Sequence, residues 1–255
     1  MGRRKKTTAT LMLLILAIPH RLSLNQKNRL ILWNVGQGQW LTYSTSTFCH
    51  HLDMGGEKIQ WWRVRRECGQ KVNTVQFSHW DWDHLSFLKN AQGTLPQICL
   101  SRPPQGPKPT SLTKLSWMNS LAPCRPQPHS LPWREIQWDI LPSKKIQPND
   151  FSRVMIAQSR VLVPGDSPSK QERQWLNEIG SNHLRQIRLL ILGHHGSKTS
   201  TSDSLLQGLP TLRQAWVSAR RRRYGHPHQK VVKKLKTKGV PLLTTEAWGN
   251  LILID

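Results

Sequence analysis

The chain has 255 residues, which is enough for one large α/β domain or two small ones with a substantial buried core. Lysine and arginine outnumber aspartate and glutamate by 37 to 14, so the formal net charge is +23. A charge of this size makes a merely solvated basic surface the weaker interpretation. It favours an anionic partner, either nucleic acid or an anionic membrane.

The four cysteines stand far apart with no C-x-x-C pair, which argues against a zinc ribbon and against a thioredoxin-type redox site. Two interpretations stay open for Cys49, Cys68, Cys99 and Cys124. They are either buried thiols or, in an oxidising compartment, disulfides.

The N-terminal segment, residues 1–28, is first basic and then apolar. Arg3–Lys6 precede an apolar run from Leu11 to Ile18, which is well short of the ~18 residues that a spanning helix needs. Length and flanks fit an export signal or a short anchor, although no small-x-small cleavage site follows. A buried first strand or helix is the alternative. We therefore expect the folded domain at residues 29–255.

The next part of the chain predicts strands and one helix. "RLILWNVGQGQWLTYSTS" has the pattern of a hairpin, with a glycine turn at Gly36–Gly38 between two strands. "FCHHLDMGGEK" predicts a strand that runs into a turn at Gly55 and Gly56. Residues 59–71 have the pattern of an amphipathic helix, and "VNTVQFSH" predicts another strand.

Residues 101–150 are rich in Pro, Gln and Ser, which predicts irregular structure and argues against central strands. "RVMIAQSRVLVPGD" then predicts a strand pair, followed by a helix over 168–179 with a proline near its start. "RLLILGHHGS" and "QAWVSA" predict strands. "HQKVVKKLKTKG" predicts a helix in which Val231, Val232 and Leu235 share one face and which stops at Gly239. "VPLLTT" and "NLILID" predict the last strands. This alternation, without an internal repeat, predicts a single α/β domain.

The stretch "QFSHWDWDHLSF" places two imidazoles and two carboxylates within six positions, at His79, Asp81, Asp83 and His84. In an extended segment His79, Asp81 and Asp83 project to one side and Trp80 and Trp82 to the other. Carboxylates this close repel one another unless a cation neutralises them. Imidazole and carboxylate together suit Zn, Mn or Fe, so the stretch predicts a metal site rather than a solvated polar loop.

Two further groups of metal-binding type follow predicted strands. Asp166 comes after "LVPG", and His194 and His195 come after "LLILG". A lone histidine after a strand is more often structural. Because ligands at successive strand ends share one cleft at the sheet edge, the three groups together predict one site.

These motifs, in this order, resemble the metallo-β-lactamase-fold domain of the ComEC/Rec2 DNA-internalisation proteins. The resemblance runs from about Leu30 to the C-terminus and is weakest across residues 95–150. H-x-D-x-D-H marks the broad superfamily, and "GHHGSKTSTS" and "YGHP" narrow it to this branch.

The resemblance implies an α/β fold, the metallo-β-lactamase αββα four-layer sandwich, with two divalent metal ions, Zn or Mn, at one edge. The ligands that it implies are His79, Asp81, Asp83, His84, Asp166 as a carboxylate shared between the metals, and His195 or His194. Asp53 in "LDMGG" matches a residue that supports the ligand loop from outside the ligand set. His226 in "YGHP" lies on a loop that approaches the metals.

The function that the resemblance implies is metal-dependent phosphodiester hydrolysis of DNA in natural transformation, with His226 or His194 protonating the leaving oxygen. The implied partners are DNA, single-stranded in this family's role, and membrane components of a DNA-uptake system; no small organic cofactor is expected. The implied location is the outer face of the membrane or the periplasm of a bacterium, with the cytoplasm as the alternative.

The sequence departs from the family pattern at several positions. Asn34 and Gln39 replace two acids, Trp80 and Trp82 replace small residues, Ser86 and Phe87 stand where a Gly-Gly pair is usual, Arg222 stands where Asn is frequent, and Glu246 replaces Asp. Two alternatives therefore stay open beside the nuclease. One is a non-catalytic DNA-binding module with a structural metal site, and the other is a phosphoesterase with a small substrate.

Basic and aromatic residues lie next to the predicted site in the sequence. A run of arginines precedes "YGHP", and lysines line one face of the following helix, so both are candidates for phosphate contacts. The predicted nucleic-acid contacts are Arg220, Arg221, Arg222, Arg223, Lys230, Lys233 and Lys234. Trp80 and Trp82 are candidates for base stacking, although most of the 12 tryptophans are expected in the core.

Overall fold

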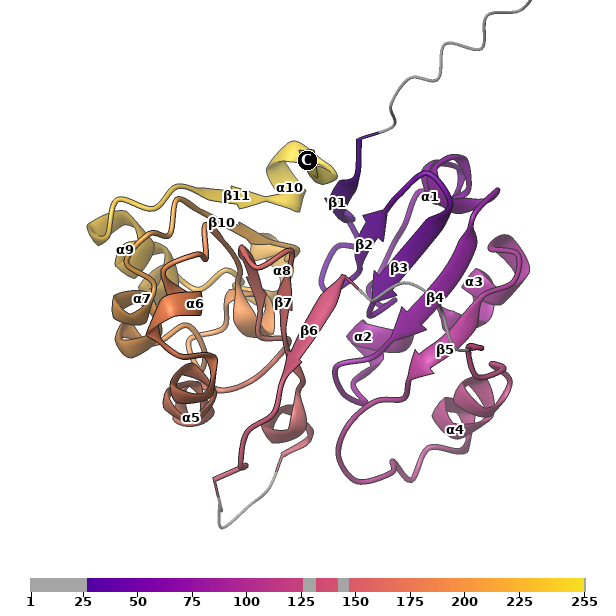
Figure 1. The fold of residues 1–255 in the computed structure, drawn as a ribbon, viewed down its shortest axis with the longest axis horizontal. Coiled ribbons are helices and arrows are strands. Elements are labelled where there is room, and N and C mark those ends of the chain that lie inside the picture. Colours follow the sequence, from indigo (N-terminus) through magenta and orange to yellow (C-terminus); the bar gives the residue numbers. More distant parts are fainter. Residues whose placement is uncertain (1–26, 126–131, 142–146, 255) are drawn as a thin grey trace, which may run out of the picture.

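Two six-stranded β-sheets pack face to face, and helices cover the outer side of each sheet (Figure 1). The computed structural model describes residues 27–125, 132–141 and 147–254. The expectation of an export signal or anchor falls on residues 1–28, almost all of which lie outside the described part. Within that part, no helix is long and apolar enough to cross a membrane.

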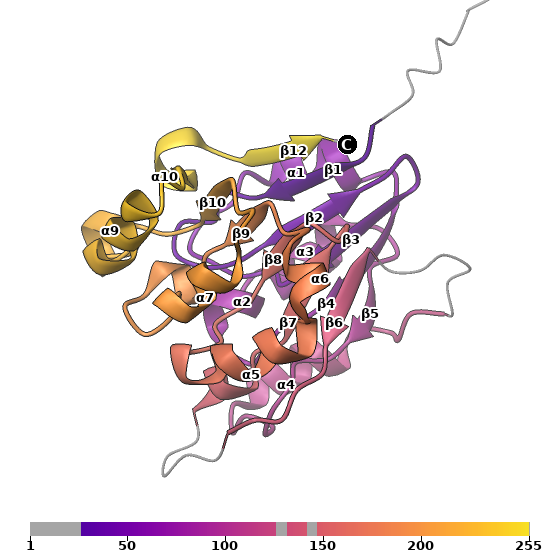
Figure 2. The same cartoon turned by 60° about the vertical axis from the view of Figure 1, so that its left-hand side comes forward.

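The first sheet has the strand order β12-β1-β2-β3-β4-β5. Strands β12, β1, β2 and β3 pair with one another in antiparallel fashion, and β4 and β5 continue the sheet in parallel with β3. Figure 2 shows the C-terminal strand β12 beside β1. The strands are β1 (Arg29–Leu32), β2 (Leu41–Ser44), β3 (Phe48–Leu52), β4 (Val72–Gln76), β5 (Cys99–Arg102) and β12 (Leu251–Ile254).

The second sheet has the order β11-β10-β9-β8-β7-β6. Strands β8 to β11 are parallel, and β7 and β6 complete the sheet in antiparallel pairing. The strands are β6 (Trp133–Ile136), β7 (Val154–Ala157), β8 (Val161–Val163), β9 (Leu189–Ile191), β10 (Gln214–Val217) and β11 (Leu242–Thr244).

The longer helices form the two outer layers, and the short ones lie in the loops. Over the first sheet lie α1 (Trp61–Cys68), α3 (Leu88–Thr94) and α4 (Leu112–Asn119). Over the second sheet lie α5 (Ser169–Ile179), α7 (Asp203–Gly208) and α9 (Gln229–Thr237). The short helices are α2 (Trp82–Leu85), η1 (Pro148–Phe151), α6 (Ser181–Leu184), η2 (Gly193–Gly196), α8 (Arg221–Tyr224) and α10 (Thr245–Trp248).

The period of two along each strand produces these four layers, because alternate side chains enter different cores. In β1, Leu30 and Leu32 lie in the core between the sheets, whereas Ile31 packs in the core beneath the helices of the first sheet. In β8, Val163 faces the other sheet and Leu162 faces the outer helices. Apolar residues on both faces therefore give an αββα sandwich, and the predicted fold class is confirmed.

The predicted elements are confirmed in both halves of the chain, with the largest difference in the proline-rich part. Strands β5 and β6 each lie at the edge of a sheet, as the prolines around them predict. The same part also contains α4, which the composition did not predict. The Ser111 side chain accepts from the Lys114 backbone N–H, a cap that starts this helix.

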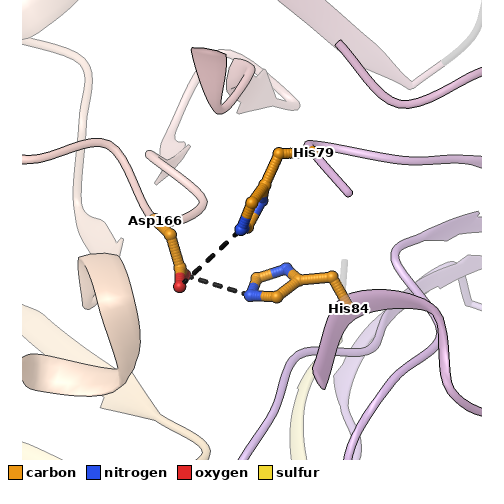
Figure 3. A group of neighbouring side chains, drawn as sticks. All are labelled: His79, His84 and Asp166. Carbon is orange, nitrogen blue, oxygen red and sulfur yellow. Dashed lines mark ion pairs between the residues drawn. The ribbon is translucent and has the colours of Figure 1, made fainter. Parts of the chain in front are cut away.

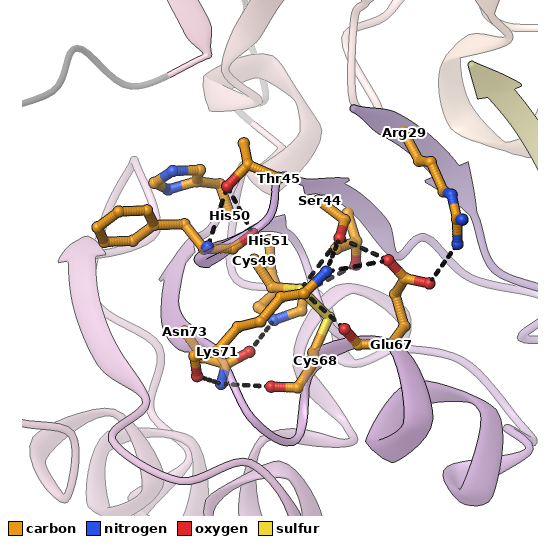
Figure 4. Close-up of a disulfide and its surroundings, with 12 residues drawn as sticks. Arg29, Ser44, Thr45, Cys49, His50, His51, Glu67, Cys68, Lys71 and Asn73 are labelled. Atoms are coloured by element: carbon orange, nitrogen blue, oxygen red, sulfur yellow. Dashed lines mark hydrogen bonds and ion pairs between the residues drawn. A yellow bond between two sulfur atoms is a disulfide. The ribbon is translucent and has the colours of Figure 1, made fainter. Parts of the chain in front are cut away.

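The cysteines form two disulfides, which decides between the alternatives left open by the sequence. Cys49–Cys68 joins β3 to the end of α1, and Cys99–Cys124 joins β5 to the segment after α4. Around the first bridge, Glu67 accepts from Arg29, Ser44 and Lys71 (Figure 4). Each bridge therefore fastens an outer helix or its exit segment to the first sheet.

We expect the double variant Cys49→Ser/Cys68→Ser to lower the free energy of unfolding by about 3 kcal/mol, since the bridge closes a loop with a sequence separation of 19. Both side chains are fully buried, so the new hydroxyls add a desolvation cost. Urea denaturation with and without reductant measures the change. Reductant should shift the midpoint of the native chain more than that of the variant; equal stabilities of the oxidised native chain and the variant would contradict a stabilising bridge.

Candidate metal centre

The candidate site lies where the carboxyl ends of strands from both sheets meet. From the first sheet, β3 leads to Asp53 and β4 leads to His79 and α2. From the second sheet, β8 leads to Asp166 and β9 leads to η2, which carries His194 and His195. Ligands of α/β folds bind at the carboxyl ends of parallel strands, so the topology brings these residues to one edge.

On the first sheet the chain stays extended up to Asp81, and α2 begins at Trp82. His79 and Asp81 lie on one side, as predicted, with His79 Nε2 3.5 Å from Asp81 Oδ2. The prediction that Trp80 and Trp82 share the opposite side is wrong, because the helix begins between them. Trp80 is 7% exposed in the core, whereas Trp82 is 43% exposed.

The second sheet supplies a carboxylate that reaches the histidines of the first (Figure 3). Asp166 Oδ1 lies 3.1 Å from His84 Nε2, and Asp166 Oδ2 lies 3.9 Å from His79 Nε2. His195 Nε2 lies 3.6 Å from Asp166 Oδ2 and 3.0 Å from Asp83 Oδ2. Asp166 thus contacts histidines that follow strands of both sheets.

Two sets of ligand atoms are close enough to bind a cation. One is His79, His84 and Asp166, and the other is Asp83, His84 and His195; in each set the atoms lie within 4.8 Å of one another. The structure therefore brings together five of the six residues predicted as ligands in these sets. The sixth, Asp81, adjoins the first set through its contact with His79.

Buried polar atoms without well-formed hydrogen bonds provide the test of whether a cation fits. Among the described residues, the Nε2 atoms of His79, His84 and His195 and the Oδ1 atom of Asp166 are buried and make no hydrogen bond of good geometry, although charged atoms of the same ligand sets lie 3.0 to 3.9 Å away. Buried polar groups are nearly always hydrogen-bonded, so four such atoms at one point need an explanation. Imidazole nitrogens and carboxylates are the ligands of Zn and Mn, and these residues fit such an ion.

Asp53 orients the histidine that belongs to both sets. Its Oδ2 accepts from His84 Nδ1 at 2.8 Å, from Ser78 Oγ at 2.8 Å and from Gln39 Nε2 at 2.7 Å, and its Oδ1 accepts from the Ser78 backbone N–H at 2.7 Å. With Nδ1 committed to Asp53, His84 presents Nε2 to the site. Carboxylates commonly fix metal-binding histidines in this way.

Gln39 shows what one departure from the family pattern does. Its amide donates to the buried Asp53 carboxylate, where an acid would place a second negative charge beside the first. Its backbone N–H also donates to the Asp83 carbonyl at 2.9 Å, so Gln39 fixes the position of α2 without belonging to the ligand sets. The other replaced acid, Asn34, lies beside Gly249 and Asn250.

Gly55 allows the same loop to approach α2 closely. A Cβ atom at this position would lie 2.3 Å from the carbonyl carbon of Asp83 and the amide nitrogen of His84. The neighbouring Met54 N–H donates to the His84 carbonyl at 2.7 Å. A side chain at residue 55 would therefore displace the helix that carries two ligands.

The electrostatics couple the ligands tightly. Burial alone would lower the pKa of His84, but the carboxylates of Asp166 and Asp53 raise it well above its usual range. Burial would raise the pKa of Asp166, but the neighbouring histidines, His84 foremost, hold it well below. The carboxylates of the site therefore stay ionised and are surrounded by positive charge. A bound cation would also supply such compensating positive charge.

His194 and His195 both have backbone conformations that side chains rarely adopt. Their φ angles are 49° and 52°, in the left-handed region. Such strain persists where the surroundings determine it, here with His194 N–H donating to the Gly165 carbonyl at 3.0 Å. His195 belongs to one of the two candidate ligand sets. His194 lies at the rim, with Nε2 3.8 Å from Asp166 Oδ2 and a side chain 30% exposed.

His226 is held by Gln37, which the sequence pattern did not single out. The Arg220 backbone N–H donates to Gln37 Oε1 at 3.3 Å, which leaves Gln37 Nε2 to donate to His226 Nδ1 at 3.0 Å. Burial, then the nearby His195 and His194, lower the pKa of His226 and favour its neutral form. With Nδ1 accepting, the ring proton resides on Nε2. His226 lies next to His194, with ring centroids 6.2 Å apart.

The predicted basic contacts divide into two groups. Arg220 and Arg223 both bond Glu57, at 3.2 and 2.9 Å, so part of the arginine run is neutralised within the molecule. Lys230, Lys233 and Lys234 line a groove of about 470 Å³ between α7 and α9. Arg221 and Arg222 are exposed on α8.

A cleft of about 400 Å³ opens at the candidate site. Asp81 and His194 line it together with residues of η1 and of the start of α5, among them Asn149 and Lys170. The cleft therefore gives a ligand access to the rim of the metal centre, where one carboxylate and one neutral imidazole are available.

Comparison with known proteins confirms the resemblance that the motifs imply. The chain is 33% identical over 125 residues to competence protein ComA of Neisseria gonorrhoeae and 30% identical over 90 residues to ComE operon protein 3 of Bacillus subtilis. It is also 30% identical over 109 residues to recombination protein 2 of Haemophilus influenzae. These matches cover 47%, 35% and 40% of this chain but only 18%, 11% and 13% of the relatives. No family model matches the chain.

Solved structures show the same fold at low sequence identity. The metallo-β-lactamase-fold protein YhfI of Bacillus subtilis matches 89% of this chain and all of its own length, with a TM-score of 0.57 and 12% identity. A diphosphatase of the PhnP family matches 85% of this chain and 84% of its own, with a TM-score of 0.50 and 12% identity. The chain therefore has the metallo-β-lactamase fold.

We expect Asp53→Asn to weaken metal binding by roughly 10- to 100-fold, since the buried carboxylate orients His84 from outside the ligand set. Competition with a chromogenic chelator for Zn or Mn measures the affinity, and circular dichroism checks the fold. Glu67→Gln is the matched control, because Glu67 is also partly buried and hydrogen-bonded but lies at the disulfide of α1. Equal affinities of both variants and the native chain would contradict the role of Asp53.

Proposed function

We propose that this chain is a metal-dependent phosphodiesterase that cleaves DNA. The observation that carries the proposal is the set of buried imidazole and carboxylate atoms that converge at one sheet edge without well-formed hydrogen bonds, beside an open cleft. The net charge of +23 supports a polyanionic substrate over a small ester, because such a field concentrates polyanions at the surface.

The residues of the chain have distinct parts in this chemistry. His79, Asp81, Asp83, His84, Asp166 and His195 would hold a pair of divalent ions, Zn or Mn. When bound, such ions supply Lewis-acid activation of the phosphodiester and of a water molecule. Asp53 keeps His84 in the tautomer that a ligand needs, and the carboxylate of Asp166 serves both sides of the site.

His226 would act on the leaving oxygen as a hydrogen-bond donor. Its Nδ1 is engaged by Gln37, so its Nε2–H is the donor available beside His194. His194 is the second candidate for this role, because it lies at the rim of the cleft with a pKa lowered by burial. Donors aimed at developing negative charge stabilise a transition state without reorganisation.

The biological setting that we propose is DNA uptake in natural transformation. Support comes from the similarity to ComA, ComE operon protein 3 and recombination protein 2, of which this chain matches only a small part. The substrate would be single-stranded DNA, and the partners would include membrane components of the uptake system. The two disulfides support a location outside the cytoplasm, since such bonds persist in oxidising compartments.

With Mn or Zn, we expect the purified protein to cleave DNA, and Asp83→Ala to lower the rate by roughly a hundredfold or more, since Lewis-acid activation contributes several kcal/mol. Single-stranded and double-stranded oligonucleotides with a fluorescent end label, resolved on a denaturing gel, give the rates. Glu178→Ala, an exposed carboxylate on α5, is the control and should retain the native rate.

The same assay separates the competing functions. Salt-sensitive DNA binding without cleavage would support the non-catalytic module instead. Hydrolysis of a small phosphodiester but not of DNA would support the small-substrate phosphoesterase. The similarity to the diphosphatase concerns the fold alone.

We expect Gln37→Met to lower kcat at least about tenfold with little change in KM or metal content, since His226 then loses the bond that fixes its tautomer. His226→Ala should lower kcat as well. The double variant should be no slower than His226→Ala alone, because both changes remove one donor. Additive losses would show that Gln37 acts through something other than His226.

A further inference from the structure

Trp82 is the one residue of the H-x-D-x-D-H stretch whose side chain has no part in the ligand set or the core. It lies between Asp81 and Asp83, and 43% of it is exposed. Its neighbour Trp80 is buried, so exposure is not a general property of this stretch. A large, exposed apolar ring next to polar residues of a candidate site is a common feature of surfaces that bind ligands.

Two residues of α4 hold the Trp82 indole in place. The Trp117 ring meets it edge to face, with ring centroids 5.4 Å apart. Lys114 Nζ lies 4.9 Å from the centroid of the Trp82 ring, a cation–π distance. Lys114 itself is buried, and its ammonium donates to the Trp80 backbone carbonyl. The indole is therefore preorganised while a large part of its surface stays accessible.

The aromatic pair adjoins the metal centre, because Trp82 lies in the chain between two carboxylates of the centre and contacts Trp117. Asp81 and Asp83, on either side of Trp82, have side chains 37% and 36% exposed, so the edge of the centre is open where the ring stands. Trp117 is itself partly exposed and extends the apolar surface onto α4. A strand that places a phosphate at the carboxylates would bring an adjacent base to the indole.

We propose that Trp82 and Trp117 form a stacking subsite for an unpaired nucleobase, so that the centre acts on single-stranded DNA or on frayed ends. The proposal rests on the proposed function of the same site. Stacking on aromatic rings is indifferent to sequence because every base has a π-face. A paired base within a duplex is already stacked on both sides, so the subsite selects against duplex DNA.

Affinity for a short oligothymidylate and for an abasic oligonucleotide of the same length tests the subsite. Both affinities are measured by fluorescence anisotropy with the full chain, in the presence of Ca²⁺ so that binding is followed without cleavage. The metal content is checked for each variant. Trp82→Ala should weaken binding of the oligothymidylate by roughly 5- to 100-fold, the range that stacking of one base gives. Trp82→Phe should retain part of the affinity, and Trp117→Ala should weaken it to a smaller extent.

Trp62→Ala is the matched control, because Trp62 on α1 is 58% exposed but lines a groove with Arg29 and Ile252 that shares no residue with the centre. It should bind both oligonucleotides as the native chain does. Equal losses for the base-bearing and abasic strands in Trp82→Ala, or no loss in either, would overturn the subsite. Since binding is measured without cleavage, a Trp82-dependent preference for bases would stand even if the nuclease assay failed.

Discussion

The contact between Asp166 and His84 joins the two halves of the chain at the candidate metal centre. Asp166 follows a strand of the second sheet and His84 lies on a helix of the first, and their nearest atoms are 3.1 Å apart. Both residues are buried, and an isolated charge in such a place would cost several kcal/mol. The sandwich can keep these groups at its seam only because opposite charges, or a cation, compensate them.

This constraint explains why so many residues outside the ligand set are committed to the site. Asp53 accepts hydrogen bonds at both oxygens, and Gln39 supplies one of the donors. The close approach of Gly55 to α2 and the left-handed backbone of His195 each remove freedom from a loop that carries ligands. Loops that were free to relax would separate the like-charged groups. The fold therefore tolerates backbone strain in these loops, and the strained loops keep the ligand atoms close together.

Local patterns in the sequence were sufficient for most strands, for the helices α1, α5 and α9, and for singling out the residues that gather at the candidate site. The continuous apolar runs of β1 and β8 fit strands that are buried on both faces, and the spacing of His79 to His84 predicts a metal site. Contacts between distant segments could not be predicted from the sequence. Gln37 bonds His226 across 189 positions, and Glu57 bonds Arg220 across 163 positions, and no local pattern predicts either contact. The helix α4 lies in a proline-rich part, where composition outweighed the Ser111 cap.

The pairing of charges also changes how the basic character of the chain should be understood. The arginines next to the "YGHP" loop are not simply a track for phosphate, because Glu57 ties Arg220, Arg223 and the Tyr224 hydroxyl together. Glu57 also accepts from the Gln37 backbone N–H at 3.0 Å, so the same carboxylate connects α8 to the residue that orients His226. Local positive charge here serves to position the loop. On α9, Lys234 pairs with Asp203, and Lys230 and Lys233 line the same groove. Part of the net charge of +23 thus holds the site together, and the rest would attract the polyanion that we propose as the substrate.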